Sequence, residues 1–313
     1  MRAGKIIAAS LLLTLAVCAL AFFSRAISDF IYYNHTVILS VAVVVLCVAL
    51  LAQYKHTAVL RENARLYREL QVRQAHIDRD MSMARNVQQG LLKQKIPRLK
   101  GCKICAACRP AEKIGGDFYG VQLKNSRAHF FLGDVAGHGI SSALVMALTR
   151  GLLQELINQL DDPARILAAL NNSLNDYIHD TPSFVALFYG CYDPRARKLT
   201  YITAGQNPAL LFCGGVLADR LQTGGSILGM FAGQKFPAKN LKLQKGDRLI
   251  CYTDGFTEAR AASGAELGED FIIDALQKII DKPLDKIKTG LYASLDRAAK
   301  TINDDLSLLC FEA

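Results

Sequence analysis

The sequence lacks the motifs that identify the common hydrolases and nucleotide-binding proteins. It has no Ser-His-Asp pattern, no GxSxG nucleophile elbow and no Walker loop. No nucleic-acid-binding motif accompanies its formal net charge of +9. With no side-chain nucleophile evident, any catalysis by this chain must rest on other residue types.

Positive charge is concentrated in one segment of the chain. Residues 1–54 carry a net charge of +2, residues 55–113 carry +9 and residues 114–313 carry −2. A basic segment directly after an apolar run is typical of attraction to anionic lipid headgroups. We therefore predict contact with a membrane and no nucleic-acid partner.

Two apolar runs open the chain, at residues 6–23 and 37–52. Each is uncharged and near the length that spans a bilayer. Basic residues flank their outer ends, so the positive-inside rule places both ends of the hairpin in the cytoplasm. We predict a membrane hairpin of two transmembrane helices over residues 1–54, which makes the chain a multi-pass protein of the inner (cytoplasmic) membrane with its catalytic domain in the cytoplasm.

The alternative for the first run is a cleaved signal peptide. The segment has a basic start, and Cys18 follows a stretch with some similarity to a lipoprotein cleavage box. However, the bulky Val17 precedes the cysteine, and no small-residue cleavage site follows. These features favour the hairpin.

Residues 55–95 contain no proline and one glycine, and we predict a cytoplasmic linker helix there. Arg73 occupies a position that a strong coiled coil would fill with leucine, so the predicted coiled coil is weak or switchable. Pairing of this helix would make the chain a homodimer, and the alternative is a helix packed on its own domain. The apolar positions at helical spacing are Leu66, Leu70, Ile77, Met81, Ala84, Val87 and Leu91.

Pro97 ends the linker helix, because the residue before a proline disfavours helical geometry. We predict a globular domain over residues 96–313. Blocks of strands and paired helices without regular alternation favour an α+β layered fold over a doubly wound one. We predict strands at residues 102–108, 118–123, 128–135, 184–192, 199–203, 209–212, 216–221, 248–253 and 306–311. We predict helices at residues 141–160, 163–179, 271–280 and 284–301.

Nine cysteines are present, and most of them stand singly in strand-like or membrane segments. This distribution favours a reducing cytosolic compartment over a disulfide framework. Cys102, Cys105 and Cys108 have the CxxCxxC spacing of a metal site, but in a strand the middle residue faces away from the other two. We predict that these cysteines serve packing.

Acidic residues stand at the ends of four predicted strands, at Asp117, Asp134, Asp254 and the pair Asp304-Asp305. Carboxylates gathered in this way repel one another unless cations neutralise them. Ligation by oxygen alone selects hard ions such as Mg²⁺ or Mn²⁺, and two such ions can activate a water for attack on phosphorus. Taken singly, each Asp-Gly pair also fits an ordinary turn.

The order and context of these motifs resemble one family. The segments are GGDFY at 115–119, GDVAGHG at 133–139, TAGQNP at 203–208, YTDGFTEA at 252–259 and DDLS at 304–307. Over residues 84–312 the chain resembles the type 2C metal-dependent protein phosphatases (PPM), specifically their RsbU/SpoIIE-like branch. The resemblance implies two antiparallel β-sheets sandwiched between α-helices, with two divalent cations, Mn²⁺ or Mg²⁺, at one edge.

The resemblance also implies roles for individual residues. Asp134 resembles the carboxylate that bridges both ions. Asp117 and the backbone carbonyl of Val135 resemble ligands of one ion, and Asp254 with Asp304 resemble ligands of the other. The four aspartates form the predicted catalytic set.

Four positions leave questions open or depart from the family pattern. Asp305 is the alternative to Asp304, because the doubled acid leaves the register open by one residue. Gly120 stands where an acid is common in the family, and Gln206 stands where a histidine is frequent. His138 is a candidate general acid, because its unperturbed pKa lies near neutrality.

The function implied by the resemblance is a protein serine/threonine phosphatase. Its implied substrate is a phosphoserine or phosphothreonine on a STAS-type anti-anti-sigma protein in a partner-switching pathway. The alternative is a catalytically inactive, membrane-anchored scaffold that binds a signalling regulator. A nucleotide cyclase is a third candidate, but the similarity of the Gly-Gly-Asp-Phe stretch to cyclases covers four residues only.

Overall fold

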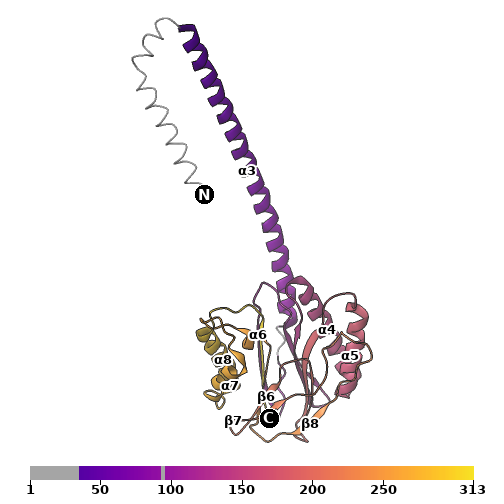
Figure 1. Cartoon of the computed structure of the whole chain (residues 1–313). Coiled ribbons are helices and arrows are strands. Elements are labelled where there is room, and N and C mark those ends of the chain that lie inside the picture. Colours follow the sequence, from indigo (N-terminus) through magenta and orange to yellow (C-terminus); the bar gives the residue numbers. More distant parts are fainter. Residues whose placement is uncertain (1–34, 93–95) are drawn as a thin grey trace. The chain divides into compact units, whose positions relative to one another are not determined.

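The computed structural model describes residues 35–92 and 96–313 (Figure 1). Its internal contacts divide the chain into two units, Met1–Ile77 and Asp78–Ala313. The first predicted membrane run, residues 6–23, lies outside the described residues, and the predicted hairpin is described only from residue 35 onward. The predicted domain borders after residues 54 and 95 stay predictions.

The described N-terminal part is one helix, α3 (His35–Leu92), of 58 residues. It joins the second apolar run to the linker without a break, because the segment between them, residues 52–56, contains neither proline nor glycine. The large apolar side chains from Val37 to Leu51 are mostly exposed, and this helix is long and apolar enough to cross a membrane. The structure therefore has one long, unburied apolar helix in this region.

The globular part is built on two antiparallel sheets of five strands each. Sheet A contains, in spatial order, β1 (Lys103–Arg109), β10 (Leu306–Glu312), β9 (Arg248–Tyr252), β6 (Ala209–Cys213) and β7 (Val216–Leu221). Sheet B contains β2 (Phe118–Lys124), β3 (Arg127–Val135), β4 (Val185–Asp193), β5 (Lys198–Ala204) and β8 (Lys239–Lys242). The predicted α+β fold with two antiparallel sheets is confirmed.

Helices cover the outer faces of both sheets (Figure 1). On sheet B lie α4 (Ile140–Gln159) and α5 (Pro163–Ile178), and on sheet A lie α6 (Gly255–Glu258), α7 (Gly268–Gln277) and α8 (Leu284–Ala298). A third apolar cluster fills the space between the sheets, where the rings of Phe130 and Phe311 stack 5.1 Å apart. The four layers thus enclose three apolar cores.

Two elements escaped prediction. The strand β8 has the sequence Lys-Asn-Leu-Lys and no fully buried residue, so it carries no hydrophobic alternation. It forms because it pairs with β5 at the edge of sheet B. The helix α6 is a single turn directly after Asp254. Neither length nor periodicity reveals elements this short.

The strand registers bring the acidic motifs to one edge of the sandwich. In sheet B, Phe118 at the start of β2 pairs with Gly133 near the end of β3. In sheet A, Tyr252 at the end of β9 pairs with Leu308 near the start of β10. Residues that precede β2 and β10 therefore lie at the same end as residues that follow β3 and β9.

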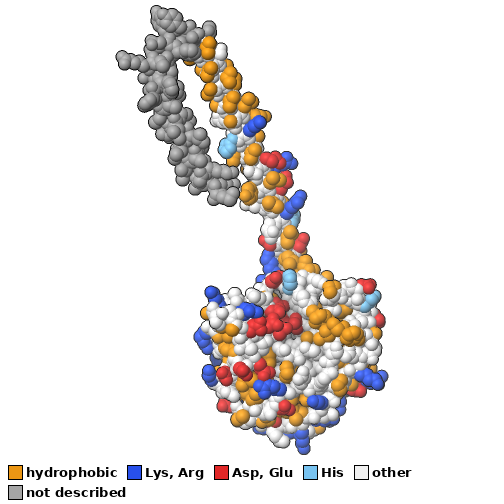
Figure 2. Space-filling model, viewed as in Figure 1, with side chains coloured by type: hydrophobic (Ala, Val, Ile, Leu, Met, Phe, Trp, Pro, Cys, Tyr) orange, Lys and Arg blue, Asp and Glu red, His pale blue; other side chains and the backbone are white. Residues whose placement is uncertain are grey.

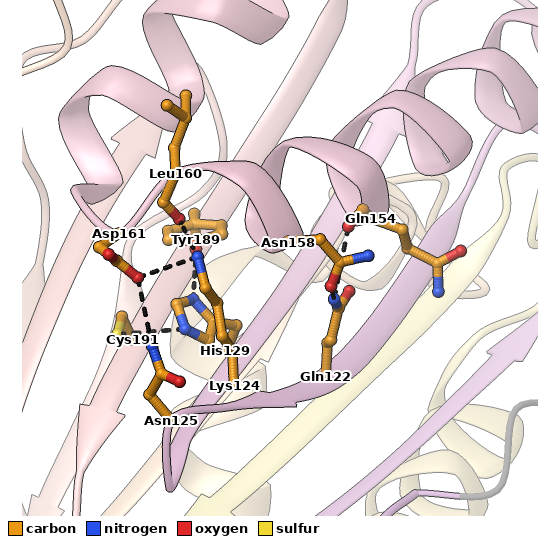
Figure 3. Close-up of polar contacts among 10 residues, drawn as sticks. All are labelled: Gln122, Lys124, Asn125, His129, Gln154, Asn158, Leu160, Asp161, Tyr189 and Cys191. Carbon is orange, nitrogen blue, oxygen red and sulfur yellow. Dashed lines mark hydrogen bonds and ion pairs between the residues drawn. The ribbon is translucent and has the colours of Figure 1, made fainter.

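Polar contacts fasten the C-terminal end of α4 to sheet B (Figure 3). The ammonium group of Lys124 donates to the carbonyl of Leu160 over 2.9 Å and pairs with the Asp161 carboxylate, also at 2.9 Å. The amide of Gln122 donates to the side chain of Asn158. The turn between α4 and α5 is thereby held against β2.

A buried histidine lies close to this turn (Figure 3). The Nδ1 atom of His129 is 2.6 Å from the hydroxyl of Tyr189, and its Nε2 is 3.8 Å from the Sγ of Cys191. Burial, followed by the charges of Lys124 and Arg127, lowers the pKa of His129 to about 4. The ring is therefore neutral at physiological pH, and both of its nitrogens have partners.

Candidate metal centre

Asp117 is a buried carboxylate that the protein only half satisfies. It lies directly before β2, and its Oδ2 accepts a hydrogen bond from the Thr253 hydroxyl over 2.8 Å. Its Oδ1 is buried without a hydrogen-bond partner. Burial, followed by the negative charges of Asp134 and Asp305, raises its pKa well above the usual range. Burying a carboxylate oxygen without a hydrogen-bond partner costs free energy, and a bound cation would offset that cost.

Asp134, at the end of β3, faces the other acids of the edge. Burial, followed by the charges of Asp254 and Asp304, raises its pKa to about 7. Burial and the charge of Asp304 likewise raise the pKa of Asp254. The acids thus form two neighbouring pairs, Asp117 with Asp134 and Asp254 with Asp304.

The two candidates in the Asp-Asp pair occupy different environments. The Asp305 Oδ1 accepts from the backbone N–H of Ala111 over 2.8 Å, and its Oδ2 accepts from those of Gly116 (2.8 Å) and Asp117 (3.3 Å). Asp304 is exposed, and its Oδ1 accepts from the N–H of Asp305 over 2.7 Å. The carboxylate of Asp305 is therefore occupied in holding the Gly-Gly-Asp loop, and that of Asp304 is not.

Glycines make the close approach of these segments possible. A Cβ atom at Gly115 would collide with the carboxylate of Asp305. A Cβ atom at Gly116 would lie 2.7 Å from the backbone carbonyl oxygen of Val135. The glycine pair therefore lets the loop before β2 contact both Asp305 and the end of β3, and it brings the Val135 carbonyl beside Asp117.

This donor set fits hard cations. Among residues 35–92 and 96–313, no three His, Cys, Asp or Glu side chains converge closely enough to hold one ion by themselves. The acids meet in pairs instead, and Mg²⁺-like ions keep several waters and use one or two carboxylates. Figure 2 shows a concentrated acidic patch on the visible face of the molecule. Paired carboxylates, an orphaned carboxylate oxygen and a nearby backbone carbonyl suit two water-rich Mg²⁺ or Mn²⁺ sites.

The candidate general acid His138 and two nearby basic side chains, Lys113 and Arg150, have partners outside the four acids. The His138 side chain is 89% exposed, with its Nδ1 3.7 Å from Glu112. The Lys113 ammonium pairs with Asp78 of α3, and the Arg150 guanidinium donates to the backbone carbonyl of Tyr119. None of these three contacts involves one of the four acids.

Two departures from the family pattern have structural causes. A Cβ atom at Gly120 would collide with the ring of Phe131 on the neighbouring strand, so this position requires glycine. The amide of Gln206 is buried and donates to the carbonyl of Tyr252 over 3.1 Å. Gln206 thus supports the end of β9.

The three clustered cysteines contact three different parts of the domain. Cys105 is buried in the core under α7 and α8, whereas Cys102 packs on the core between the sheets. Cys108 packs on the core under α4 and α5, and its thiol lies 3.8 Å from the carbonyl of Asp117. Their side chains do not converge.

Two residues of the site were not singled out from the sequence. The Thr253 hydroxyl donates to Asp117 and accepts from the N–H of Ser307 over 2.9 Å, which links both sheets to the acidic edge. In the sequence, the feature that could have indicated Thr253 was its hydroxyl group directly before Asp254. Gln88 of α3 is buried, and its amide donates to the Gly115 carbonyl over 2.7 Å and accepts from its N–H over 3.3 Å. For Gln88, the only feature in the sequence was a polar residue next to the apolar position Val87 of the predicted linker helix.

Comparisons with known proteins agree with this geometry. The family described as "Stage II sporulation protein E (SpoIIE)" matches residues 124–313. The chain is 28% identical over 243 residues to the phosphoserine phosphatase RsbU of Bacillus subtilis, covering 75% of this chain and 70% of RsbU. It is 26% identical over 221 residues to the phosphoserine phosphatase RsbP of the same organism, covering 69% of this chain and 53% of RsbP.

Solved structures show the same fold. The SiaA-PP2C domain of Pseudomonas aeruginosa superposes with a TM-score of 0.68 at 21% identity, covering 77% of this chain and 98% of that domain. RsbX in complex with magnesium gives a TM-score of 0.51 at 15% identity, covering 70% of this chain and 98% of RsbX. The catalytic domain of PstP in complex with two manganese ions gives a TM-score of 0.52 at 13% identity, covering 67% of this chain and 97% of that domain. Related PP2C structures thus bind Mg²⁺ or Mn²⁺.

Fold and acidic edge together define a phosphatase of the PP2C class. Within that class, the chain belongs to the SpoIIE family, and it is similar to the phosphoserine phosphatases RsbU and RsbP.

Proposed function

We propose that the chain hydrolyses phosphoserine or phosphothreonine on a protein, with a water activated by two divalent cations. The observation that supports this most is the edge where Asp117, Asp134, Asp254 and Asp304 meet, with the Oδ1 of Asp117 buried and unpartnered. Burial and mutual repulsion raise the pKa of Asp117, Asp134 and Asp254, and such a cluster has no evident structural benefit without cations.

The proposed roles follow from the two pairs. Asp117 and the Val135 carbonyl would hold one ion, Asp254 and Asp304 the other, and Asp134 would face both. When bound, the ions supply a nucleophilic water and neutralise charge on the phosphoryl oxygens. Asp305 is the positioning residue, because its carboxylate holds the loop that presents Asp117. Thr253 fixes the orientation of the Asp117 carboxylate.

The proposed substrate is a phosphorylated STAS-type anti-anti-sigma protein in a partner-switching pathway. Similarity to RsbU and RsbP supports a phosphoserine substrate, since both are phosphoserine phosphatases. A crystal structure containing the RsbU and RsbW domains of Rv1364c from Mycobacterium tuberculosis has the same fold, with a TM-score of 0.60 at 26% identity, covering 70% of this chain and 63% of that one. An RsbU-like domain beside a second signalling domain is consistent with such a pathway.

The proposed location is the inner membrane, with two spans and the phosphatase domain in the cytoplasm. The exposed apolar part of α3 supports one span, and the basic residues that follow it support a cytoplasmic domain. The described residues 55–92 are helical, and Leu66, Leu70 and Ile77 remain exposed. Pairing of this stripe with a second copy would bury it, so we propose a homodimer through the linker helix.

A direct test is hydrolysis of para-nitrophenyl phosphate and of a serine-phosphorylated STAS domain by the full chain in lipid nanodiscs. Activity should require Mn²⁺ or Mg²⁺, disappear with EDTA and return when metal is added. If neither substrate is hydrolysed across both metals while the protein remains folded, the chain is an inactive scaffold and the proposed activity is wrong.

A further inference from the structure

Helix α4 is more apolar than its buried face requires. Only 39% of its most apolar stretch is buried, although its composition would suit a membrane span. Ile140 is 55% exposed and Leu144, one turn later, is 66% exposed. The same row continues with the half-buried Leu148 and Leu152. Large apolar side chains exposed side by side at one end of a helix are typical of an interaction surface.

The exposed end of α4 is the end nearest the acidic edge. Ile140 follows Asp134 by only six residues. A Cβ atom at Gly116, directly before Asp117, would lie 3.2 Å from the Cβ of Ser142 in the first turn of α4. A molecule seated on Ile140 and Leu144 would therefore also reach the carboxylates. Figure 2 shows a hydrophobic patch beside the acidic patch on the same face.

The other end of α4 is anchored, so its exposed face is held in place. Gln122 and Lys124 of β2 bind the last turn of the helix and the turn after it (Figure 3). Two buried side chains of α4, Leu153 and Ile157, are fully enclosed in the core over sheet B. A surface that is already rigid loses little entropy when a partner binds to it.

We propose that the exposed face of α4, formed by Ile140 and Leu144 and continued by Leu148 and Leu152, docks the folded phosphoprotein substrate. The partner would present an apolar surface beside its phosphorylated residue, with the phosphate directed to the acidic edge. This inference rests on the proposed phosphatase function. In this proposal, two surfaces decide which substrate is hydrolysed. The acidic edge accepts any phosphate ester, and the exposed face of α4 selects the protein that carries it.

The test compares three substrates with the full chain in nanodiscs. They are a serine-phosphorylated STAS domain, the phosphopeptide that spans its modified serine, and para-nitrophenyl phosphate. The variants are Ile140→Ser, Leu144→Ser and their combination. Val216→Ser is the matched control, because Val216 is also 66% exposed but lies on β7, at the edge of the other sheet.

We expect the double variant to lose about tenfold or more in kcat/KM toward the folded domain, since each side chain would lose apolar burial on binding. Hydrolysis of the peptide and of the ester should fall by less than about twofold. The control should match wild type on all three substrates. Thermal unfolding of each variant verifies that the fold is kept.

Several results would overturn the proposal. Equal losses on all three substrates would show that α4 acts on the site itself, and no loss on any would leave this face without a role in substrate choice. A change in oligomeric state, measured by mass photometry, with unaltered preference for the folded domain would assign the face to a second copy. If wild type hydrolyses the folded domain no faster than its peptide, docking plays no part. If wild type hydrolyses nothing, the phosphatase proposal itself fails.

Discussion

Strand β3 carries two polar side chains, the buried His129 and the partly buried Asp134, whose surroundings differ. At His129, both ring nitrogens have partners, Tyr189 and Cys191, and burial keeps the ring neutral. Five residues along the strand, burial and the charges of other acids raise the pKa of Asp134 to about 7, and the nearby Asp117 keeps a buried oxygen without a partner. The histidine belongs to a closed network, whereas the acids belong to an incomplete one.

This difference separates a structural polar group from a functional one. Buried polar atoms are normally satisfied within the protein, and a complete network stabilises the fold by itself. A buried carboxylate oxygen without a partner is costly, so such an oxygen is more often found where a ligand or cation binds. The predictions below are ways to break or sharpen this contrast.

The largest effect is expected from Asp134→Asn. Removing the carboxylate that faces both pairs should lower the turnover of para-nitrophenyl phosphate by about a thousandfold or more, which corresponds to roughly 4 kcal/mol of the barrier. The metal-free protein should not lose stability, because the amide relieves repulsion among the acids. Turnover with saturating Mn²⁺ and thermal unfolding in EDTA provide the two measurements. Activity near the wild-type value would contradict the metal assignment.

Substitutions in the Asp304-Asp305 pair should separate an effect on turnover from an effect on stability. Asp304→Asn should lower turnover by roughly a hundredfold with little change in stability, because it removes a proposed metal ligand. Asp305→Asn should lower the free energy of unfolding by about 2 kcal/mol, because it weakens three backbone hydrogen bonds to a charged group. Urea denaturation and Mn²⁺ titration of both variants test this. The reverse pattern would make Asp305 the ligand and reject the assignment of Asp304.

His129 should make stability depend on pH in acid. Burial holds the pKa of the folded state at about 4, and the unfolded ring titrates near its ordinary value of about 6.5. As the pH falls through this window the unfolded state takes up the proton first, so stability decreases by at most about 3 kcal/mol. His129→Gln should flatten this part of the curve. Unfolding midpoints in urea between pH 7 and 4 measure it, and identical slopes would show that other groups dominate.

The smallest effect is expected where α3 contacts the acidic edge. Gln88→Ala removes both hydrogen bonds to Gly115, and we expect about a fivefold decrease in activity at limiting Mn²⁺. Gln89→Ala, on the next and less buried position, is the matched control and should behave like wild type. Saturating Mn²⁺ should restore Gln88→Ala if the bond orders the loop before Asp117. Unchanged Mn²⁺ dependence would make the linker a passive tether.

Much of the fold was predictable because its elements are long and bounded by clear signals. The nine strands predicted in the globular part are present within a residue or so of their predicted ends. Runs of apolar residues mark most of these strands, and Asp254-Gly255 marks the turn after β9. Four-residue elements carry too few side chains to show a period, and β8 exists only because β5 offers it a pairing edge.

The sequence by itself determined which residue types stand at the strand ends and in which order, and this was enough to identify the family and to propose four acids as its site. It did not distinguish Asp304 from Asp305, since adjacent acids are equivalent until the backbone is placed. Only the tertiary structure directs three backbone N–H groups at Asp305 and leaves Asp304 exposed. It likewise brings Gln88 and Gly115 together across 27 positions. Such contacts depend on how separate segments pack in space, and residue spacing along one chain carries no information about that.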